Sequence, residues 1–116
     1  RKEVKDHGEG GMLIGAKPKG KVLIIDDVLS SGLAISESVN FLSFYDVEIV
    51  GALVTLNRLE KGLSTDNTAS GELEFKGVNI FQIISLDDLL EADELISKEN
   101  AKKMKEYREN YRGDDV

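Results

Sequence analysis

The hydrophobic pattern alternates along the chain between strand-like and helix-like segments. Continuous apolar runs rich in β-branched residues predict strands at Lys21–Ile25, Val47–Leu56 and Asn79–Ile84. The first run has no polar alternation, so we expect it to be buried on both faces of a parallel sheet. The predicted helices are Ser31–Tyr45, a short one near Thr68–Phe75, Ser85–Ala92 and Ser97–Tyr111. This order predicts an α/β fold with an open, mainly parallel sheet and right-handed crossovers.

Polar residues mark where these helices begin. Ser30 or Ser31 is the candidate N-cap of the first helix. Ser85 is the candidate cap of the third, with Asp87 and Asp88 well placed in its first turn. The last helix is polar, and its packing side comprises Ala101, Met104, Tyr107 and Arg108.

The first 18 residues have no sustained periodicity and contain four glycines. They predict a flexible loop, with a short hairpin strand at Met12–Ala16, ahead of a sheet-and-helix core over residues 19–116. The first residue is not methionine, so we expect a chain whose domain is incomplete at its N-terminus.

Composition narrows the class of protein. Hydrophobic residues make up 41% and charged residues 32%, as in ordinary globular proteins. No apolar run is long enough for a membrane span, and we expect no signal peptide. The absence of cysteine excludes disulfides and thiolate metal sites and fits a cytoplasmic location. A net charge of −7 argues against nucleic-acid binding.

The charge is unevenly distributed. Residues 1–21 carry a balance of +3, so the rest of the chain carries −10. A basic, glycine-rich segment on an acidic protein suggests a site for a small polyanion, and a solvated flexible arm explains it equally well. The cations of this segment are Arg1, Lys2, Lys5, Lys17, Lys19 and Lys21.

Asp26 and Asp27 follow the first predicted strand and precede the small residues Ser30–Gly32. Ligands of open α/β sheets gather at this edge, where a helix N-terminus and backbone N–H groups attract a phosphate. Carboxylates there accept hydrogen bonds from a sugar diol or hold Mg²⁺ through water. Together these features predict a ribose 5-phosphate site.

Two alternatives compete for the acidic pair. It could merely cap the following helix, or it could belong to a phosphoacceptor receiver domain. A receiver would need another aspartate after a later strand. Here Val47–Leu56 is followed by Asn57 and Arg58, which fits poorly.

Three segments resemble one family. VLIIDDVLSSGLA (Val22–Ala34) resembles the phosphoribosyl-diphosphate (PRPP) signature of type I phosphoribosyltransferases, which have a Rossmann-like fold. RKEVKDHGEGG (Arg1–Gly11) resembles the catalytic loop of orotate phosphoribosyltransferases, and LVTLNRLEKG (Leu53–Gly62) also resembles that family. The resemblance implies transfer of the phosphoribosyl group of PRPP to orotate, giving orotidine 5′-monophosphate and pyrophosphate in pyrimidine (UMP) synthesis. It also implies Mg²⁺ as cofactor and a homodimer with shared active sites.

The resemblance assigns roles to individual residues. Asp26 and Asp27 would meet the ribose hydroxyls, with Mg²⁺ nearby held through PRPP and water rather than by a direct protein ligand. Orotate would contact Ser30 and Arg58, and the catalytic residues would be Lys5, His7 and Asp27. The backbone around the 5-phosphate would be that of Val28, Leu29, Ser30, Ser31, Gly32, Leu33 and Ala34. The residues around pyrophosphate would be Arg1, Lys2, Lys5 and His7.

Some features depart from the family or have a simpler explanation. Leu33 takes a position often held by threonine, which removes a hydroxyl but keeps a backbone N–H. Outside this loop motif, His7 would be read as a surface residue without a role. The alternative functions are a phosphoribosyltransferase for another base and a non-catalytic PRPP-binding regulator.

Overall fold

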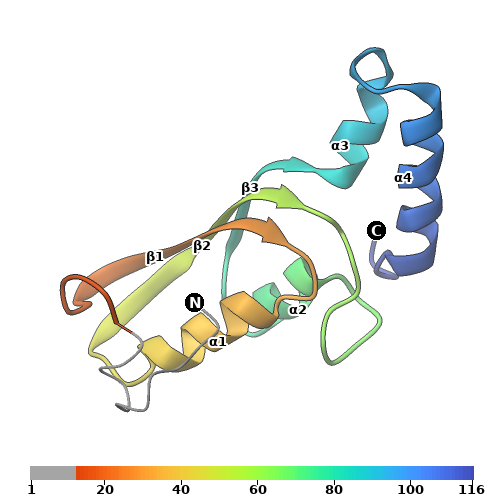
Figure 1. Ribbon diagram of the computed structural model, residues 1–116. Coiled ribbons are helices and arrows are strands. Elements are labelled where there is room, and N and C mark those ends of the chain that lie inside the picture. Colours follow the sequence, from red (N-terminus) through yellow and green to blue (C-terminus); the bar gives the residue numbers. More distant parts are fainter. Residues whose placement is uncertain (1–12) are drawn as a thin grey trace.

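The computed structural model describes residues 13–116. In that part of the chain, strands and helices alternate in the predicted order (Figure 1). The strands are β1 (Gly20–Leu29), β2 (Val47–Asn57) and β3 (Ile80–Ser85). The helices are α1 (Leu33–Leu42), α2 (Ala69–Phe75), α3 (Leu86–Glu91), the 3-10 helix η2 (Asp93–Leu95) and α4 (Lys98–Tyr111).

The three strands form one parallel sheet in the order β1-β2-β3. Asp26 pairs with Val54 and Leu29 pairs with Asn57, so the carboxyl ends of β1 and β2 lie side by side. Asn57 in turn pairs with Ser85 at the end of β3. The predicted α/β fold with a parallel sheet is therefore confirmed, and all three strands end at one edge.

Helices α1 and α2 cover one face of this sheet (Figure 1). The core lies between them and the strands, and Ile35, Ala52 and Val54 are at most 1% exposed. Burial of such aliphatic side chains is the main force that holds α1 to the sheet. The whole core cluster is Ile24, Leu29, Ile35, Leu42, Ala52, Val54, Ala69, Leu73 and Val78.

Among the described residues, no helix covers the opposite face (Figure 1). Ile25 is 72% exposed and Ile83 is 66% exposed, and Leu23 and Phe81 on the same face are also exposed. The prediction that the first strand is buried on both faces is thus wrong for this part of the chain. Leu23 and Ile25 of β1 are both exposed there, at 41% and 72%.

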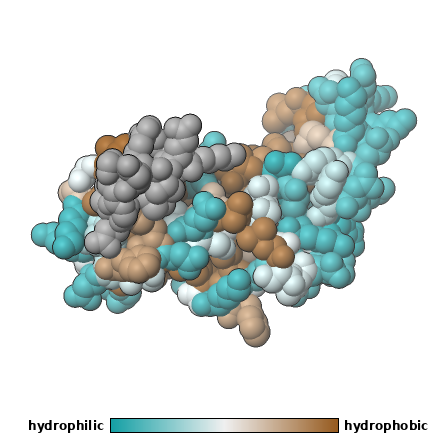
Figure 2. Space-filling model, turned by 60° about the horizontal axis from the view of Figure 1, so that its bottom comes forward, coloured by the Kyte–Doolittle hydropathy of each residue, from teal (hydrophilic) through white to brown (hydrophobic). Residues whose placement is uncertain are grey.

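Helices α3 and α4 stand beyond the end of the sheet (Figure 1). Ser85 caps α3 as predicted, and it does so in a capping box: its hydroxyl accepts the Asp88 N–H, and the Asp88 carboxylate accepts the Ser85 N–H. Polar residues dominate the surface in the region of α4, shown in teal in Figure 2. The partly buried residues of α4 are the four predicted: Ala101, Met104, Tyr107 and Arg108.

Helix α1 departs from its prediction at both ends. Its N-cap is Gly32 with φ +88°, not Ser30 or Ser31, and no side chain caps it. It ends at Leu42 instead of Tyr45: the N–H groups of Phe44 and Tyr45 bond to carbonyls three residues back, those of Phe41 and Leu42, in a tighter turn. The predicted hairpin strand at Met12–Ala16 is not found over Leu13–Ala16, while Met12 lies outside the described residues.

Within residues 13–116, no helix has the length and apolar character needed to cross a membrane.

Candidate functional site

The candidate site lies at the carboxyl edge of the sheet, where β1 passes through a three-residue loop into α1. Backbone conformation here depends on Gly32, which is buried and has φ +88°. An added Cβ would lie 3.4 Å from the Ala69 Cβ and 3.5 Å from Leu73 Cδ1. Since L-residues rarely adopt this φ, glycine is required for the tight turn into the helix.

The loop presents backbone groups at the start of α1. The Leu33 N–H donates to the Ser31 hydroxyl at 3.4 Å, whereas the N-cap residue, Gly32, has no side chain that could cap the helix. The Leu33 side chain is 51% exposed. The other N–H groups of the first helical turn, together with the helix dipole, favour an anion at this position.

Asp26 and Asp27 lie within β1 and not after its end, where the predicted strand Lys21–Ile25 places them, because the pairing with β2 continues to Leu29. The Asp27 N–H donates to Asp26 Oδ1 at 2.9 Å, and the Val28 N–H donates to Asp27 Oδ1 at 2.8 Å. Each carboxylate is thereby oriented by the backbone through one oxygen. The Asp27 side chain is exposed and that of Asp26 is partly exposed, so both have access to a ligand.

Arg58 is brought next to this loop by strand pairing. Its backbone N–H donates to the Leu29 carbonyl at 3.1 Å, one residue before the loop begins. The two segments that sequence analysis assigned to PRPP and to orotate therefore adjoin at the ends of β1 and β2.

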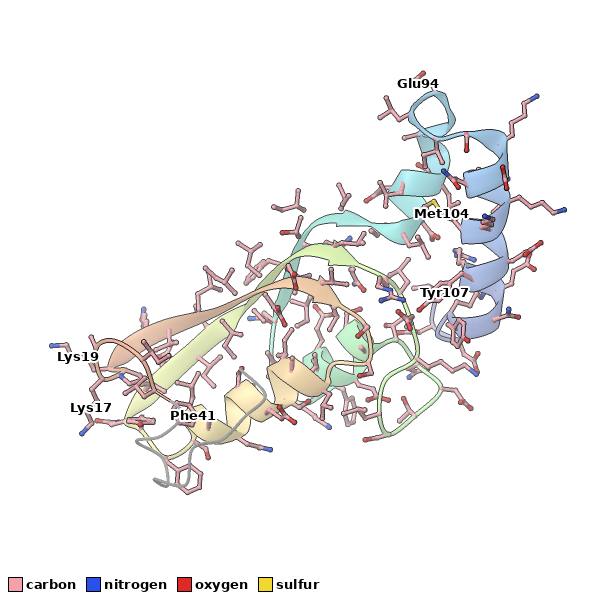
Figure 3. All side chains as sticks on the ribbon, viewed as in Figure 1. Lys17, Lys19, Phe41, Glu94, Met104 and Tyr107 are labelled. Atoms are coloured by element: carbon pink, nitrogen blue, oxygen red, sulfur yellow. The ribbon has the colours of Figure 1, made fainter. Side chains whose placement is uncertain are left out.

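The Arg58 side chain extends toward α4. Its Nε lies 2.6 Å from Glu60 Oε2, although without the alignment of a hydrogen bond, so charge holds this pair. Its Nη2 donates to the Tyr107 hydroxyl, and the guanidinium carbon lies 4.9 Å from the centre of the Tyr107 ring. Figure 3 shows Tyr107 on the side of α4 that faces the segment leaving β2.

Asn57 is a structural residue that sequence analysis did not single out. It is 2% exposed. Its Nδ2 donates to Ser70 Oγ at 3.1 Å and to Gln82 Oε1 at 2.9 Å, and its Oδ1 accepts the Leu59 N–H at 3.0 Å. Asn57 thus joins β2, β3 and α2 directly before Arg58. The sequence signal that could have indicated Asn57 is a polar residue at the end of an apolar strand.

Glu72 is a second residue that sequence analysis missed. Its buried carboxylate accepts the N–H groups of Ser64 and Thr65 and the Thr65 hydroxyl. Burial by itself raises the pKa of Glu72, but the hydrogen bonds from Thr65, Ser64 and Leu63 outweigh it and leave the pKa below its usual value. The charged form therefore holds the loop that follows Arg58.

The remaining predicted residues fall into two groups. The residues assigned to the 5-phosphate, Val28, Leu29, Ser30, Ser31, Gly32, Leu33 and Ala34, form the end of β1, the loop and the start of α1, with the strand ending four residues later and the helix starting two residues later than predicted. The predicted pyrophosphate residues Arg1, Lys2, Lys5 and His7 lie outside the described residues.

No group of three or more histidine or acidic side chains that could hold a metal ion is found among residues 13–116. Asp26 and Asp27 are only two carboxylates, each with one oxygen engaged by the backbone. Mg²⁺ is commonly bound by one or two carboxylates together with waters and substrate phosphates. The pair fits that kind of site and does not form a complete protein cage.

Comparison with known proteins shows similarity to orotate phosphoribosyltransferases. No family model matches the chain. The orotate phosphoribosyltransferase of Actinobacillus pleuropneumoniae is 44% identical over 96% of this chain and 53% of its own length. That of Neurospora crassa is 41% identical over 99% of this chain and 54% of its own length. The chain thus spans about half the length of the curated relatives it matches.

Solved structures give the same result. The crystal structure of the Francisella tularensis orotate phosphoribosyltransferase superposes with a TM-score of 0.63 at 27% identity, over 80% of this chain and 47% of that one. The Mycobacterium tuberculosis enzyme, in a complex with Fe(III) dicitrate, gives a TM-score of 0.60 at 26% identity, over 77% of this chain and 47% of that one. These matches confirm the type I phosphoribosyltransferase fold.

Proposed function

We infer that this chain, homologous to orotate phosphoribosyltransferases over about half of their length, is part of an enzyme that transfers the phosphoribosyl group of PRPP to orotate. The observation that carries the proposal is the junction of two segments. The loop after β1 adjoins Arg58 after β2, through the hydrogen bond from the Arg58 N–H to the Leu29 carbonyl. A phosphosugar and an anionic base bound there would lie side by side.

In the proposed reaction, the bond from C1 of the ribose to the pyrophosphate oxygen breaks. A ring N–H of orotate releases its proton to solvent and its nitrogen forms the new bond to C1, giving orotidine 5′-monophosphate and pyrophosphate. The transition state is oxocarbenium-like, so the protein contributes mainly positioning and charge stabilisation.

Each part of the site has a physical role in this scheme. Asp26 and Asp27 accept hydrogen bonds from the ribose hydroxyls, and the N–H groups from Ser30 to Ala34 surround the 5-phosphate. Arg58 offers a planar guanidinium to the orotate carboxylate. Ser30 reaches the phosphate or orotate from the same loop.

The proposed cofactor is Mg²⁺, which would neutralise the departing pyrophosphate. Asp26 and Asp27 would hold it through water while PRPP oxygens bind it directly. Arg1, Lys2, Lys5 and His7 would surround the pyrophosphate, with Lys5 or His7 donating a proton to it.

An assay of the full-length protein with a panel of bases identifies the nucleobase that it accepts. We expect orotidine 5′-monophosphate and pyrophosphate to form in equal amounts from PRPP and orotate, and no product from adenine, guanine or hypoxanthine. Turnover with a purine but not with orotate would instead establish a phosphoribosyltransferase for another base.

The distinction between an enzyme and a PRPP-binding regulator depends on Lys5. In an enzyme, Lys5→Ala should lower turnover far more than PRPP affinity, because its charge acts mainly on the leaving group. Equal losses in both would indicate that the basic segment only binds.

A homodimer with shared active sites and a cytoplasmic location complete the proposal. Light scattering on the full-length protein should give twice the subunit mass at the concentrations where it is active. A monomeric mass with full activity would exclude shared sites.

A further inference from the structure

The C-terminal residues enclose the segment that carries Arg58. Two backbone hydrogen bonds connect them: the Gly113 N–H donates to the Leu59 carbonyl at 2.9 Å, and the Lys61 N–H donates to the Tyr111 carbonyl at 2.9 Å. Residues 50 to 54 positions apart in the sequence are thus paired like short strands beside the candidate site.

A side-chain contact extends this pairing. The Asp115 carboxylate accepts the Thr68 N–H at 2.7 Å and the Thr68 hydroxyl at 2.9 Å, so it binds the start of α2. Gly113 is buried, and a Cβ there would overlap the Thr68 backbone. The chain can approach this closely only because Gly113 has no side chain.

Leu59 shows that the enclosed segment is held under strain. Its φ is +58°, a conformation that costs a non-glycine residue about 1–2 kcal/mol. It is fixed from both sides, since its N–H donates to Asn57 Oδ1 and its carbonyl accepts the Gly113 N–H. Such strain persists where surrounding contacts over-determine the backbone, and it is common at functional sites.

The strained residue directly follows Arg58, whose guanidinium is oriented by two side chains. Glu60 lies at Nε and the Tyr107 hydroxyl accepts from Nη2, with the Tyr107 ring beneath the cation. A guanidinium has its donors in one rigid plane. Fixing two of its nitrogens therefore fixes the direction in which Nη1 points.

The surroundings of Tyr107 raise its pKa above the ordinary value. Burial is the largest cause, followed by the neighbouring Glu60, while Arg58 acts in the opposite direction. Like any tyrosine hydroxyl at neutral pH, that of Tyr107 is protonated, and it accepts a hydrogen bond from Arg58 Nη2.

We propose that Tyr107 is a positioning residue for orotate recognition, and that α4 with the C-terminal turn acts as a clamp on the segment bearing Arg58. The clamp holds Arg58 ready for the carboxylate of an anionic base. Without the Tyr107 hydroxyl, Arg58 would have to be ordered when the base binds, at a cost in affinity. The distance between α4 and the phosphate loop along the chain makes this role invisible in the sequence.

The inference rests on the proposed function, and the test uses the full-length protein. Tyr107→Phe keeps the ring but removes the hydroxyl, so we expect the KM for orotate to rise about tenfold with the KM for PRPP unchanged. In an Arg58→Ala background, Tyr107→Phe should cause no further change, because its effect acts through Arg58.

Tyr111→Phe is the matched control. Tyr111 lies one turn further along α4, its ring centre 4.6 Å from that of Tyr107, and it is 51% exposed. Its part in the clamp is the backbone carbonyl that accepts the Lys61 N–H, which Tyr111→Phe leaves in place, and its hydroxyl makes no hydrogen bond to Arg58 among residues 13–116. We expect the KM values of this variant for both substrates to match those of the wild type.

A second measurement is independent of turnover. The ¹⁵N heteronuclear NOE of the Arg58 Nε–H should be high in the wild type and in Tyr111→Phe, and low in Tyr107→Phe. An unchanged NOE and an unchanged KM for orotate in Tyr107→Phe would refute the positioning role while leaving the proposed function intact. If the wild type made no product from orotate, the proposed function would fail, and the NOE would still decide whether Tyr107 positions Arg58.

Discussion

At the scale of a single residue, the positive φ of Gly32 can be tested by substitution. Its φ of +88° costs an L-residue about 1–2 kcal/mol. We therefore predict that Gly32→Ala lowers the free energy of unfolding by that amount in urea titrations. Because the turn forms the proposed phosphate site, PRPP affinity should also fall.

Gly77→Ala controls for the backbone term. Gly77 has a similar φ of +93° with nothing within 4 Å of an added Cβ, and it follows α2 rather than the candidate loop. Its substitution should lower stability to a similar extent and leave PRPP affinity unchanged. If both variants bound PRPP as the wild type does, the turn at Gly32 would have no part in ligand binding.

Residue-level predictions succeeded where local chemistry decides the structure. Ser85 was identified as a cap because serine followed by acidic residues favours a helix start by itself. Leu59 and Asn57 could not be found in this way. The positive φ of Leu59 is imposed by Asn57 and by Gly113, and Gly113 lies 54 positions later in the sequence.

At the scale of elements, the order of strands and helices was predicted correctly, but several of their ends were not. The apolar periodicity indicates which residues face the core, and it correctly predicted the four partly buried residues of α4. It does not report where a helix stops. After Leu42 the N–H groups of Phe44 and Tyr45 bond three residues back instead of four, a local tightening that the apolar pattern does not contain.

The contact between α3 and α4 gives a prediction about pH. Arg108 donates to both oxygens of Asp87, with Nη2 at 3.0 Å from Oδ2. This hydrogen bonding is the largest cause of the lowered pKa of Asp87, whose ordinary value is 3.8. Because the folded pKa lies below the unfolded one, the pair stabilises the fold above about pH 4 and loses that contribution as the pH falls through the folded pKa.

We accordingly expect Arg108→Gln to lower the free energy of unfolding by about 1 kcal/mol at pH 7. The difference from the wild type should shrink below pH 4 in urea titrations run at successive pH values. Lys103→Gln on the same helix is the control. Its pair with Glu99, 3.6 Å long and highly exposed, should contribute almost nothing. A pH-independent loss in Arg108→Gln would mean that packing, rather than the charge on Asp87, explains it.

At the scale of the whole molecule, the main discrepancy is the sheet face that lacks a cover. An apolar run predicts burial on both faces, but the neighbour that covers a face is a property of the tertiary structure. Here α1 and α2 cover one face, while Leu23, Ile25, Phe81 and Ile83 remain exposed on the other. Contiguous apolar patches of this kind are rare on monomeric proteins.

The 116-residue chain, produced by itself, should therefore bind a hydrophobic dye and self-associate. Ile25→Thr with Ile83→Thr should reduce dye fluorescence, because both side chains lie on the open face. Phe75→Ser is the control: Phe75 is 94% exposed but lies on α2, away from that face. Equal dye binding by the wild type and the double variant would show that the open face is not the binding surface.

Titration of the full-length protein with PRPP and Mg²⁺ most directly tests the central claim, that the end of β1 and its loop form the PRPP site. The double variant Asp26→Asn with Asp27→Asn removes both charges. It should bind PRPP at least about tenfold more weakly, since hydrogen bonds to charged groups are lost. Asp46→Asn, exposed in the connection between α1 and β2, should bind PRPP as the wild type does. Equal affinity of all three proteins for PRPP would contradict the site described here.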